Sequence, residues 1–423
     1  MEKKKKLLVI LGAGSSKPLG MPLVSDLDKC MRQWGKGWAK LNGLKDHFRK
    51  LCCSVRAYYK AGGSGLRPDP NFEKVLGEMV ALAHWMEPAP WGDTLRRVVS
   101  NGTPRLTFRY HNEKYGPTEE LMDQLNYLLG ALARHMRALS RELDSTSTQE
   151  REKYRELLRG LRKKFDVGVY NLNYDTAALG ALPDAYTGFS ETGSFEPGLV
   201  HKRTAWDFVY HLHGSVHYSL NRRFGDEICW KQNLTEGEFF DAPEGRSSDK
   251  RSEGRSFPMT TLIAGGFKLD QLLVEPFHSL HGALIRHVYA ADAILIGGYG
   301  FVDVHINRAL RNCFNAGNAS PRVPVMVLNR ACDKTDPMAF RNDMWAIELC
   351  STLSTDGHFF AEHGHASPPV PAELAKRDAF EVDARHRVAL WHGGFIKAER
   401  RLPSIIRWLE GATDGVLVPN SAR

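Results

Sequence analysis

The pattern of apolar and polar residues along this chain changes from strand-like to helical and back. A run of apolar residues, 7–11, is typical of a strand buried on both faces of a parallel sheet. Strand patterns return in FDVGVYNLNYD (165–175), DFVYHLHG (207–214), DAILIGGYG (292–300) and RVPVMVLNR (322–330). Each ends in glycine or polar residues, and ligands bind at the carboxyl ends of the strands in an open parallel sheet. The sequence therefore predicts an α/β fold with a parallel sheet and one ligand crevice.

The chain between the first two strands is mainly helical in pattern. Over 118–143, apolar residues recur at helical spacing, among them Leu121, Leu125 and Leu129. The basic stretch 151–165 predicts a second amphipathic helix. Because these helices separate two parts of one predicted sheet, they indicate an insertion in an α/β domain.

The domain boundaries follow from this pattern. We expect one α/β domain over 1–345, interrupted by a mainly helical insertion at about 35–160, and a first helix that Ser25 caps. The role of 346–423 stays open, since its last helix pattern suits either packing on the core or an interface. A chain of 423 residues, 42% of them hydrophobic, can bury a sizeable core.

Cysteine usage and hydropathy predict a cytoplasmic protein. The seven cysteines include no Cys-x-x-Cys pair, which is typical of reduced thiols in the cytosol. The lysines at 3–6 precede an apolar run too short for a secretory signal, and no stretch is long and apolar enough to cross a bilayer. The net charge of +8 is spread over the whole chain, so it does not by itself indicate nucleic-acid binding.

The turn after the first strand is the first candidate site. Gly12, Ala13 and Gly14 let backbone amides approach a ligand closely. The hydroxyls of Ser15 and Ser16 are suited to donate hydrogen bonds to a phosphate. Many tight strand-to-helix turns contain glycine for conformational reasons alone, so the turn does not establish a phosphate site without further motifs.

The neighbouring residues exclude two common phosphate-binding motifs. A P-loop needs Gly-Lys followed by Ser or Thr, whereas Gly20 is followed by Met21 and Pro22. A dinucleotide-binding fingerprint needs a third glycine where Lys17 stands. The segment resembles instead the opening of the sirtuin family, in which Gly-Ala-Gly-x-Ser is followed by Ser-Gly-Ile-Pro. Residues 12–16, Gly20 and Pro22 stand at those spacings.

The resemblance continues along the chain in the family's order. Four further motifs of the family each coincide with a predicted strand end. They are Asn-x-Asp at Asn173 and Asp175, His-Gly at His213 and Gly214, the glycine-rich segment at Gly297 and Gly298, and the strand-ending Asn at Asn329. The chain is most similar to the bacterial sirtuin-like branch of antiviral defence, where Leu-His-Gly-Ser and Gly-Tyr-x-Phe-x-Asp-x-His-Ile-Asn recur, as at 212–215 and 298–307. The resemblance covers the α/β core and implies a Rossmann-like sheet.

The resemblance implies that NAD+ is a substrate, hydrolysed to nicotinamide and ADP-ribose. The bond between nicotinamide and C1′ breaks through an oxocarbenium-like state, and the leaving group is already cationic, so no strong general acid is needed. Asn173 would orient a water or the ribose hydroxyls, and His213 would take a proton. Asp175 would anchor a hydroxyl or fix the turn.

The nucleotide would lie along the glycine-rich segments. The resemblance implies that the amides of 12–16 bind the pyrophosphate. Gly297 and Gly298 would leave room for the nucleotide backbone, and Asn329 would reach the adenosine ribose. Only Cys229 lies where deacetylase-type members carry a four-cysteine zinc module, so we expect no zinc and no protein deacetylation.

Simpler interpretations of single residues stay open. Asn173 and Asp175 are also suited to cap the helix that starts at Thr176. Asp303 is interpreted as the N-cap of the next helix rather than a catalytic acid, and His305 as a residue of that helix's first turn near the crevice.

A metal site is a further alternative. His211 and His213 share one face of a strand and, together with His217, could bind a metal of the kind some hydrolases use. No acidic residue stands at a fitting spacing, so the sequence predicts no metal ligands. His211 is interpreted as structural.

An enzyme that destroys cellular NAD+ must stay inactive until it is triggered. The resemblance therefore implies a gated effector of antiphage defence and abortive infection, a homo-oligomer that works with a partner such as a HerA-type ATPase or a short Argonaute. Nucleic acid would be contacted only through that partner. The alternatives are a catalytically quiet domain that senses NAD+ or ADP-ribose in a defence complex, and an ADP-ribosyltransferase or cyclase with the same site. The presence of both Asn173 and His213 favours an enzyme.

Overall fold

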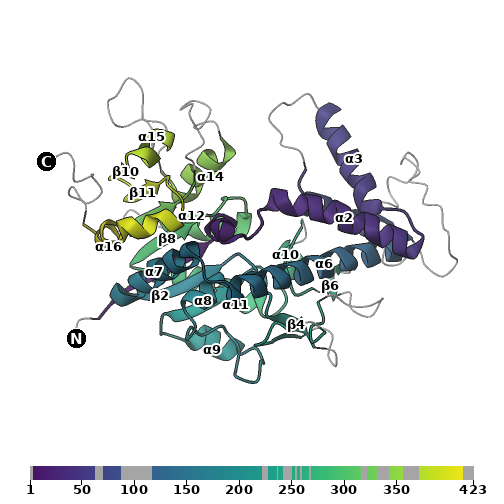
Figure 1. Ribbon diagram of the computed structural model, residues 1–423, viewed down its shortest axis with the longest axis horizontal. Helices are drawn as coiled ribbons and strands as arrows, with labels where there is room; N and C mark the ends of the chain where they lie inside the picture. The colour runs from purple at the N-terminus through teal and green to yellow at the C-terminus, as the bar shows by residue number, and fades with distance from the viewer. Residues whose placement is uncertain are drawn as a thin grey trace.

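A single seven-stranded sheet organises the protein (Figure 1). The computed structural model describes residues 3–61, 70–86, 117–221, 227–235, 237–241, 250–252, 255–257, 260–265, 268–315, 322–330, 343–355 and 371–412. The strands of the sheet are, in spatial order, β10 (Phe380–Asp383), β11 (Val388–Trp391), β9 (Val325–Leu328), β8 (Ala293–Gly297), β1 (Lys5–Leu11), β2 (Phe165–Asn171) and β3 (Asp207–His211). Neighbours are parallel except β10, which is antiparallel to β11. The prediction of an α/β fold with a Rossmann-like parallel sheet is confirmed.

The central strand β1 explains why its sequence is continuously apolar. It pairs with β2 on one side and β8 on the other. Leu7, Val9 and Leu11 contribute to the core on one face of the sheet. Leu8 and Ile10 contribute to the core on the other face. Because both faces are covered, no position of the strand is left for a polar side chain.

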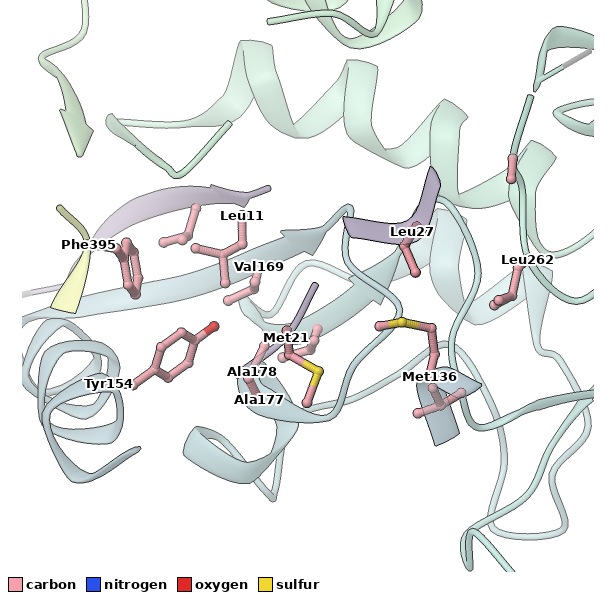
Figure 2. Close-up of a cluster of buried hydrophobic side chains, with 14 of the residues drawn as sticks. Leu11, Met21, Leu27, Met136, Tyr154, Val169, Ala177, Ala178, Leu262 and Phe395 are labelled. Atoms are coloured by element: carbon pink, nitrogen blue, oxygen red, sulfur yellow. The ribbon is translucent and has the colours of Figure 1, made fainter. Parts of the chain in front are cut away.

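Helices cover both faces of this sheet. One core includes α7 (Gln149–Lys164) and α16 (Leu402–Leu409). The other includes α11 (Phe277–Ala290), α12 (Val304–Asn315) and α14 (Met344–Leu353). Figure 2 shows part of the first core, where Tyr154 of α7 lies beside Phe395 below the strands, with ring centroids 5.2 Å apart. This core therefore joins the helical insertion to the C-terminal part of the chain.

The order of the strands fixes where a ligand crevice can form. The chain adds β2 and β3 on one side of β1, and β8, β9 and β11 on the other. The direction of the connections thus reverses between β1 and β8. In open α/β sheets, ligands bind outside the carboxyl ends of the strands at this switch point.

The predicted insertion is helical in the described residues. It contains α3 (His47–Ala61), α4 (Phe72–Met86) and α6 (Pro117–Ser145), preceded by α2 (Val24–Asn42). Figure 1 shows α2, α3 and α6 reaching out to one side of the sheet. None of the helices in the described part of the chain is long and apolar enough to span a membrane.

The predicted cap of the first long helix is wrong. Helix α2 begins at Val24, with Leu23 rather than Ser25 at the N-cap position. The carboxylate of Asp26 accepts a hydrogen bond from the Leu23 amide at 2.9 Å. Asp26 inside the first turn, and not Ser25, therefore supplies the side-chain hydrogen bond at this end of the helix.

The region 346–423 contributes to the same sheet. β10 and β11 extend the sheet beyond β9, and Trp391 of β11 pairs with Leu328 of β9. The segment after β11 returns across the carboxyl ends of the strands, where an isolated bridge joins Arg330 to Gly393. This part of the chain therefore helps to build the crevice.

We expect Gly168→Ala to destabilise the protein. A Cβ at this position of β2 would lie 2.3 Å from the ring of Phe208, which is fully buried. The free energy of unfolding should fall by about 1–3 kcal/mol, because a packed core accommodates an added methyl only by shifting. Chemical denaturation measures this. Gly37→Ala in α2, where no atom lies within 4 Å of the new Cβ, is the control and should be neutral or slightly stabilising.

Candidate active site

A cavity of about 1500 Å³ opens at the carboxyl ends of the strands. Residues that follow β1, β2, β3, β8 and β9 line it, represented by Gly12, Asn173, His213, Asp303 and Asn329. The start of α4 and the segment 393–397 complete its wall. The structure thus brings the strand-end motifs together at the switch point of the sheet.

The glycines after β1 and β8 allow two turns to touch. The amide of Gly12 donates to the carbonyl of Gly297, and the amide of Gly14 donates to the carbonyl of Gly298, both at 2.9 Å. A Cβ on Gly14 would lie 2.9 Å from the Cα of Gly298. These amides are committed to backbone contacts. The pyrophosphate contacts predicted for this turn are therefore left to its other groups that line the cavity, such as Ala13.

Hydrogen bonds from the Asn173 side chain hold the glycine turn against the end of β2. Its amide nitrogen donates to the Gly12 carbonyl at 3.1 Å and to the hydroxyls of Ser15 and Ser16 at 3.2 and 3.0 Å. The hydroxyl of Ser15 in turn donates to the Gly12 carbonyl at 2.8 Å. Asn173 lines the cavity, and the carbonyl oxygen of its amide is the polar atom left for a ligand. The capping interpretation does not describe this residue.

Asp175 does cap a helix. Its carboxylate accepts a hydrogen bond from the Ala177 amide at 2.9 Å, at the start of α8 (Ala177–Ala181). The side chain is buried, and burial raises its pKa. Asp175 also lines the cavity, so the same residue contacts the start of the helix and forms part of the cavity wall.

The remaining predicted nucleotide-binding residues differ in position. Asn329 lines the cavity, and backbone hydrogen bonds of 2.9 Å to Trp391 and Gly394 hold it. Gly298 also lines the cavity. Gly297 does not line the cavity. A Cβ at this position would lie 2.4 Å from the ring of Phe395, so the missing side chain makes room for a core residue.

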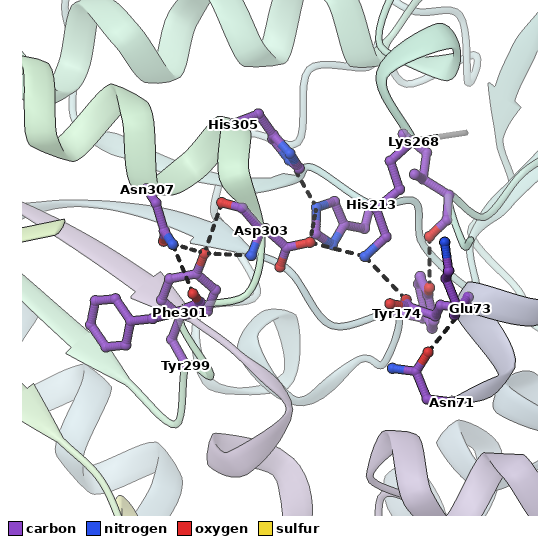
Figure 3. A network of polar contacts seen from close by, with 12 residues as sticks. Asn71, Glu73, Tyr174, His213, Lys268, Tyr299, Phe301, Asp303, His305 and Asn307 are labelled. Atoms are coloured by element: carbon purple, nitrogen blue, oxygen red, sulfur yellow. Dashed lines mark hydrogen bonds and ion pairs between the residues drawn. The ribbon is translucent and has the colours of Figure 1, made fainter. Parts of the chain in front are cut away.

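A polar network surrounds His213 (Figure 3). Its Nε2 atom lies 3.2 Å from Nε2 of His305 and 3.9 Å from Oδ1 of Asp303. The same carboxylate oxygen accepts a hydrogen bond from Nζ of Lys268 at 2.9 Å. Nζ of Lys268 also lies 3.1 Å from a carboxylate oxygen of Glu73 in α4. The network therefore links the helical insertion to the predicted catalytic histidine.

Burial sets the charge of this network. It lowers the pKa of His213 to about 3 and that of His305 to about 4, so both imidazoles are neutral at physiological pH. Burial opposes ionisation of Asp303, but the charges it faces, His213 when protonated and the Lys268 ammonium, bring its pKa down to about 2. Burial also opposes the charge of Lys268, and the two carboxyl groups beside it raise its pKa above the ordinary value. A neutral base thus faces an ionised carboxylate.

The turn that carries Asp303 is held by its own side chains. Asn307 donates from its amide nitrogen to the carbonyl of Phe301 at 2.7 Å and accepts a hydrogen bond from the Tyr299 hydroxyl at 2.8 Å. Phe301 adopts a left-handed conformation with φ 53°, which is uncommon outside glycine. These contacts direct the Asp303 carboxylate toward His213.

The interpretation of Asp303 as a helix cap is therefore wrong for its side chain. Helix α12 begins at Val304, directly after it, but the carboxylate lies in the network with Lys268. Only its backbone carbonyl serves the helix, by accepting from the Asn307 amide at 3.0 Å. His305 lies in the first turn of α12 and lines the cavity, as expected.

The residues that could hold a metal ion differ from those the sequence suggested. His213, Asp303 and His305 offer ligand atoms within 4.8 Å of one another, and they are the group found in the described part of the chain. His217 instead contacts the carbonyl of Lys231 through Nδ1 at 2.8 Å. The ammonium of Lys268 already supplies a cation beside Asp303.

Two residues of the network carried no signal in the sequence. Glu73 is an ordinary acidic residue in the first turn of a helix, and Lys268 stands in a short helix, α10 (Lys268–Gln271). Neither belongs to a motif or a strand end. The segment 393–397 is a third contribution to the wall that the pattern of the sequence did not predict.

Comparison with known protein families agrees with this geometry. Residues 167–344, which contain Asn173, His213 and Asp303, match the model of the SIR2-like domain. This segment is similar to a SIR2-like domain. Strand β1 and its glycine turn precede the matched segment but belong to the same sheet and cavity. No curated protein matches the chain.

Solved structures similar to this chain are distant. A mutant Sir2 homologue in complex with 2′-O-acetyl ADP-ribose is 12% identical, with 96% of this chain and 92% of that chain covered and a TM-score of 0.37. A Sir2 homologue in complex with NAD is 11% identical, with 96% and 90% covered and a TM-score of 0.38.

We expect Gly298→Ala to disrupt the contact between the two turns. Gly298 has φ 61°, and an added Cβ would lie 2.0 Å from the backbone nitrogen of Ser15. The free energy of unfolding should fall by about 2–4 kcal/mol, measured by chemical denaturation. Gly300→Ala in the same segment is the matched control, because the nearest atoms to its new Cβ are methyl carbons of Val302 at 3.9 Å. Equal stability of the two variants would contradict the importance of the contact.

Proposed function

We propose that this protein is an NAD+ hydrolase that releases nicotinamide and ADP-ribose. The observation that carries the proposal is the placement of Asn173 and His213 in one cavity, beside the glycine turn at the switch point of the sheet. The choice of NAD+ rests on the resemblance of the strand-end motifs to sirtuins, and the SIR2-like domain match supports it. The predicted pyrophosphate and ribose contacts belong to the same proposal.

The proposed reaction needs a base and a positioned water. The bond between C1′ of the ribose and the nicotinamide nitrogen breaks, and its electron pair neutralises the positive charge of the pyridinium. Water attacks C1′ as this bond breaks, while the neutral imidazole of His213 takes a proton from the water. The carbonyl oxygen of Asn173 would orient that water or a ribose hydroxyl. The products are nicotinamide, ADP-ribose and one proton.

Asp303 has a role in this mechanism because His213 becomes an imidazolium. Oδ1 of Asp303 lies 3.9 Å from Nε2 of His213. A fixed carboxylate at this distance stabilises the positive charge that develops on the imidazole and on the sugar. His305, whose imidazole is neutral, would accept or donate a hydrogen bond at 3.2 Å without adding charge.

We expect Asn173→Ala and His213→Ala each to lower kcat for NAD+ hydrolysis by about 10²–10⁴-fold, since each removes a group that acts on the reacting atoms. The measurement is chromatography of the products after incubation with NAD+. His278→Ala is the control, because this histidine is exposed on α11. Release of nicotinamide by the wild type and by neither active-site variant is the expected result. Equal activity of all four proteins would assign the hydrolysis to a contaminant.

The same assay separates the alternatives. A cyclic product, or ADP-ribose attached to an acceptor, would replace water by another nucleophile at the same site. Intact NAD+ with tight binding of ADP-ribose, even after addition of a partner protein and nucleic acid, would favour a sensing domain. Each of these outcomes would leave the cavity as the binding site for the nucleotide and would change only the proposed reaction.

We further propose that the enzyme is a gated effector of antiphage defence. Depletion of NAD+ is toxic to the cell that makes the enzyme, so the activity must depend on a trigger. The resemblance to the defence branch supports a homo-oligomer controlled by a partner such as a HerA-type ATPase or a short Argonaute. Nucleic acid would act through that partner, in the cytoplasm.

We expect turnover per active site to depend on assembly. NAD+ hydrolysis should rise when the purified protein is concentrated into an oligomer or mixed with its partner, because the gate opens on association. Activity and mass by light scattering are measured on the same samples over a range of protein concentrations. Equal turnover in monomeric and assembled protein would remove the gate from the proposal.

A further inference from the structure

We propose that helices α2 and α3 form a surface that binds the phosphate backbone of a nucleic acid. This goes beyond the proposed function, because it gives the chain a direct contact with nucleic acid in addition to any contact made through a partner. The surface lies outside the active site. Figure 1 shows both helices on the side of the molecule away from the C-terminal helix α16.

The positive charge of the chain is concentrated in these two helices. Residues 24–60 contain nine Lys and Arg residues and three Asp residues, a net charge of +6, whereas the whole chain of 423 residues has a net charge of +8. The charge is therefore not spread evenly along the chain. A dense cluster of Lys and Arg on helices is typical of a surface that binds nucleic acid.

The cations of α2 lie in one row along the helix. This α2 row consists of Lys29, Arg32, Lys36 and Lys40. At 3.6 residues per turn, the row falls within about 80° of the helix circumference and extends over about 16 Å. Its lysines are exposed and its arginine is half-buried. The opposite side of the helix carries the buried residues Leu27, Met31 and Trp38, so the row faces away from the core.

Helix α3 carries a second row, which adjoins the first. This α3 row consists of Arg49, Arg56 and Lys60, of which Arg49 and Lys60 are exposed. Burial raises the pKa of the Cys52 thiol to about 11, and the charges of Arg32 and Arg56 both oppose this shift. Because such effects weaken with distance, both guanidinium groups lie near the same thiol. The two rows therefore form one basic surface across α2 and α3.

The three carboxylates of this region accept hydrogen bonds from backbone amides. Asp26 accepts from the Leu23 amide at 2.9 Å. Asp28 accepts from the amide of the first residue of α4. Asp46 accepts from the Arg49 amide at 3.0 Å. The carboxylates thus stabilise the helix ends, and an excess of six positive charges remains in residues 24–60.

The composition of the surface favours phosphates over an acidic protein as the ligand. Six of the nine basic residues are lysines, and lysine is depleted at protein–protein interfaces. The length of the α2 row, about 16 Å, corresponds to about five phosphates along one DNA strand. Tyr58, near the end of α3, is 71% exposed and offers an aromatic ring on which a base of a single strand would stack.

The experiment measures the binding of fluorescein-labelled DNA of about 20 nucleotides to the full chain. Single-stranded and duplex DNA are titrated by fluorescence anisotropy at salt concentrations from about 50 to 200 mM, since phosphate contacts make affinity depend on salt. Unlabelled DNA and poly-L-glutamate are compared as competitors at equal concentrations of charge. The assay contains no NAD+, so its result does not depend on the proposed hydrolysis.

Three variants test where the DNA binds. The α2 variant combines Lys29→Gln, Lys36→Gln and Lys40→Gln. The α3 variant combines Arg49→Gln and Lys60→Gln. The control combines Lys163→Gln, Lys164→Gln and Lys202→Gln, which replace three exposed lysines outside α2 and α3 and so remove the same charge as the α2 variant. Circular dichroism checks that each variant is folded, and the α3 variant tests the surface if the α2 variant unfolds.

We expect the wild type to bind both DNAs, with log Kd rising linearly with log salt at a slope of about 4–6. The α2 variant should bind about tenfold to a hundredfold more weakly, with a slope shallower by about 2–3, because three phosphate contacts are lost. The α3 variant should change both quantities in the same direction, with a slope shallower by about 2. The control should stay within about threefold of the wild-type affinity.

Absence of binding by the wild type at about 50 mM salt would overturn the proposal. So would equal losses in the α2 variant and the control, because binding would then follow the net charge of the protein and not this surface. If poly-L-glutamate displaces the labelled DNA as effectively as unlabelled DNA does, the surface would be assigned to an acidic protein instead.

Discussion

The backbone contact between the turns after β1 and β8 is the constraint on which the site depends. The amides of Gly12 and Gly14 reach the carbonyls of Gly297 and Gly298 at 2.9 Å, a distance that side chains on the two turns would prevent. Asn173 then attaches to the same turn through the Gly12 carbonyl. Because three strand ends are joined in this way, the cavity has a rigid floor at the switch point of the sheet.

The charged network adds a second constraint of a different kind. Glu73, Lys268 and Asp303 come from the insertion, a short helix and the turn after β8, and they meet beside His213 at distances of 2.9–3.9 Å. Removing such groups from water costs free energy, which the structure offsets only when every charge has a partner. The insertion is therefore tied to the site electrostatically, in addition to the apolar packing that holds it against the sheet.

Five of the seven strands could be predicted, because β1, β2, β3, β8 and β9 are buried on both faces and their apolar runs are visible in one dimension. The sequence did not predict β10 and β11. β10 has four residues, and two of them are buried acids: Glu381 contacts His392 at 3.0 Å, and Asp383 contacts His386 at 2.6 Å. In β10, charged residues paired inside an edge strand hide the hydrophobic pattern on which the prediction depends.

The sequence by itself determined the strand ends and the order of their motifs, and so placed Asn173, His213 and Asn329 near one crevice. Parallel strands with buried faces require this, since their carboxyl ends share one edge of the sheet. Only the tertiary structure decided that the Asp303 carboxylate faces His213 and that Glu73 and Lys268 complete the network. Spacing along the chain contains no information about such contacts, because they form between loops and helices whose relative positions are set by packing.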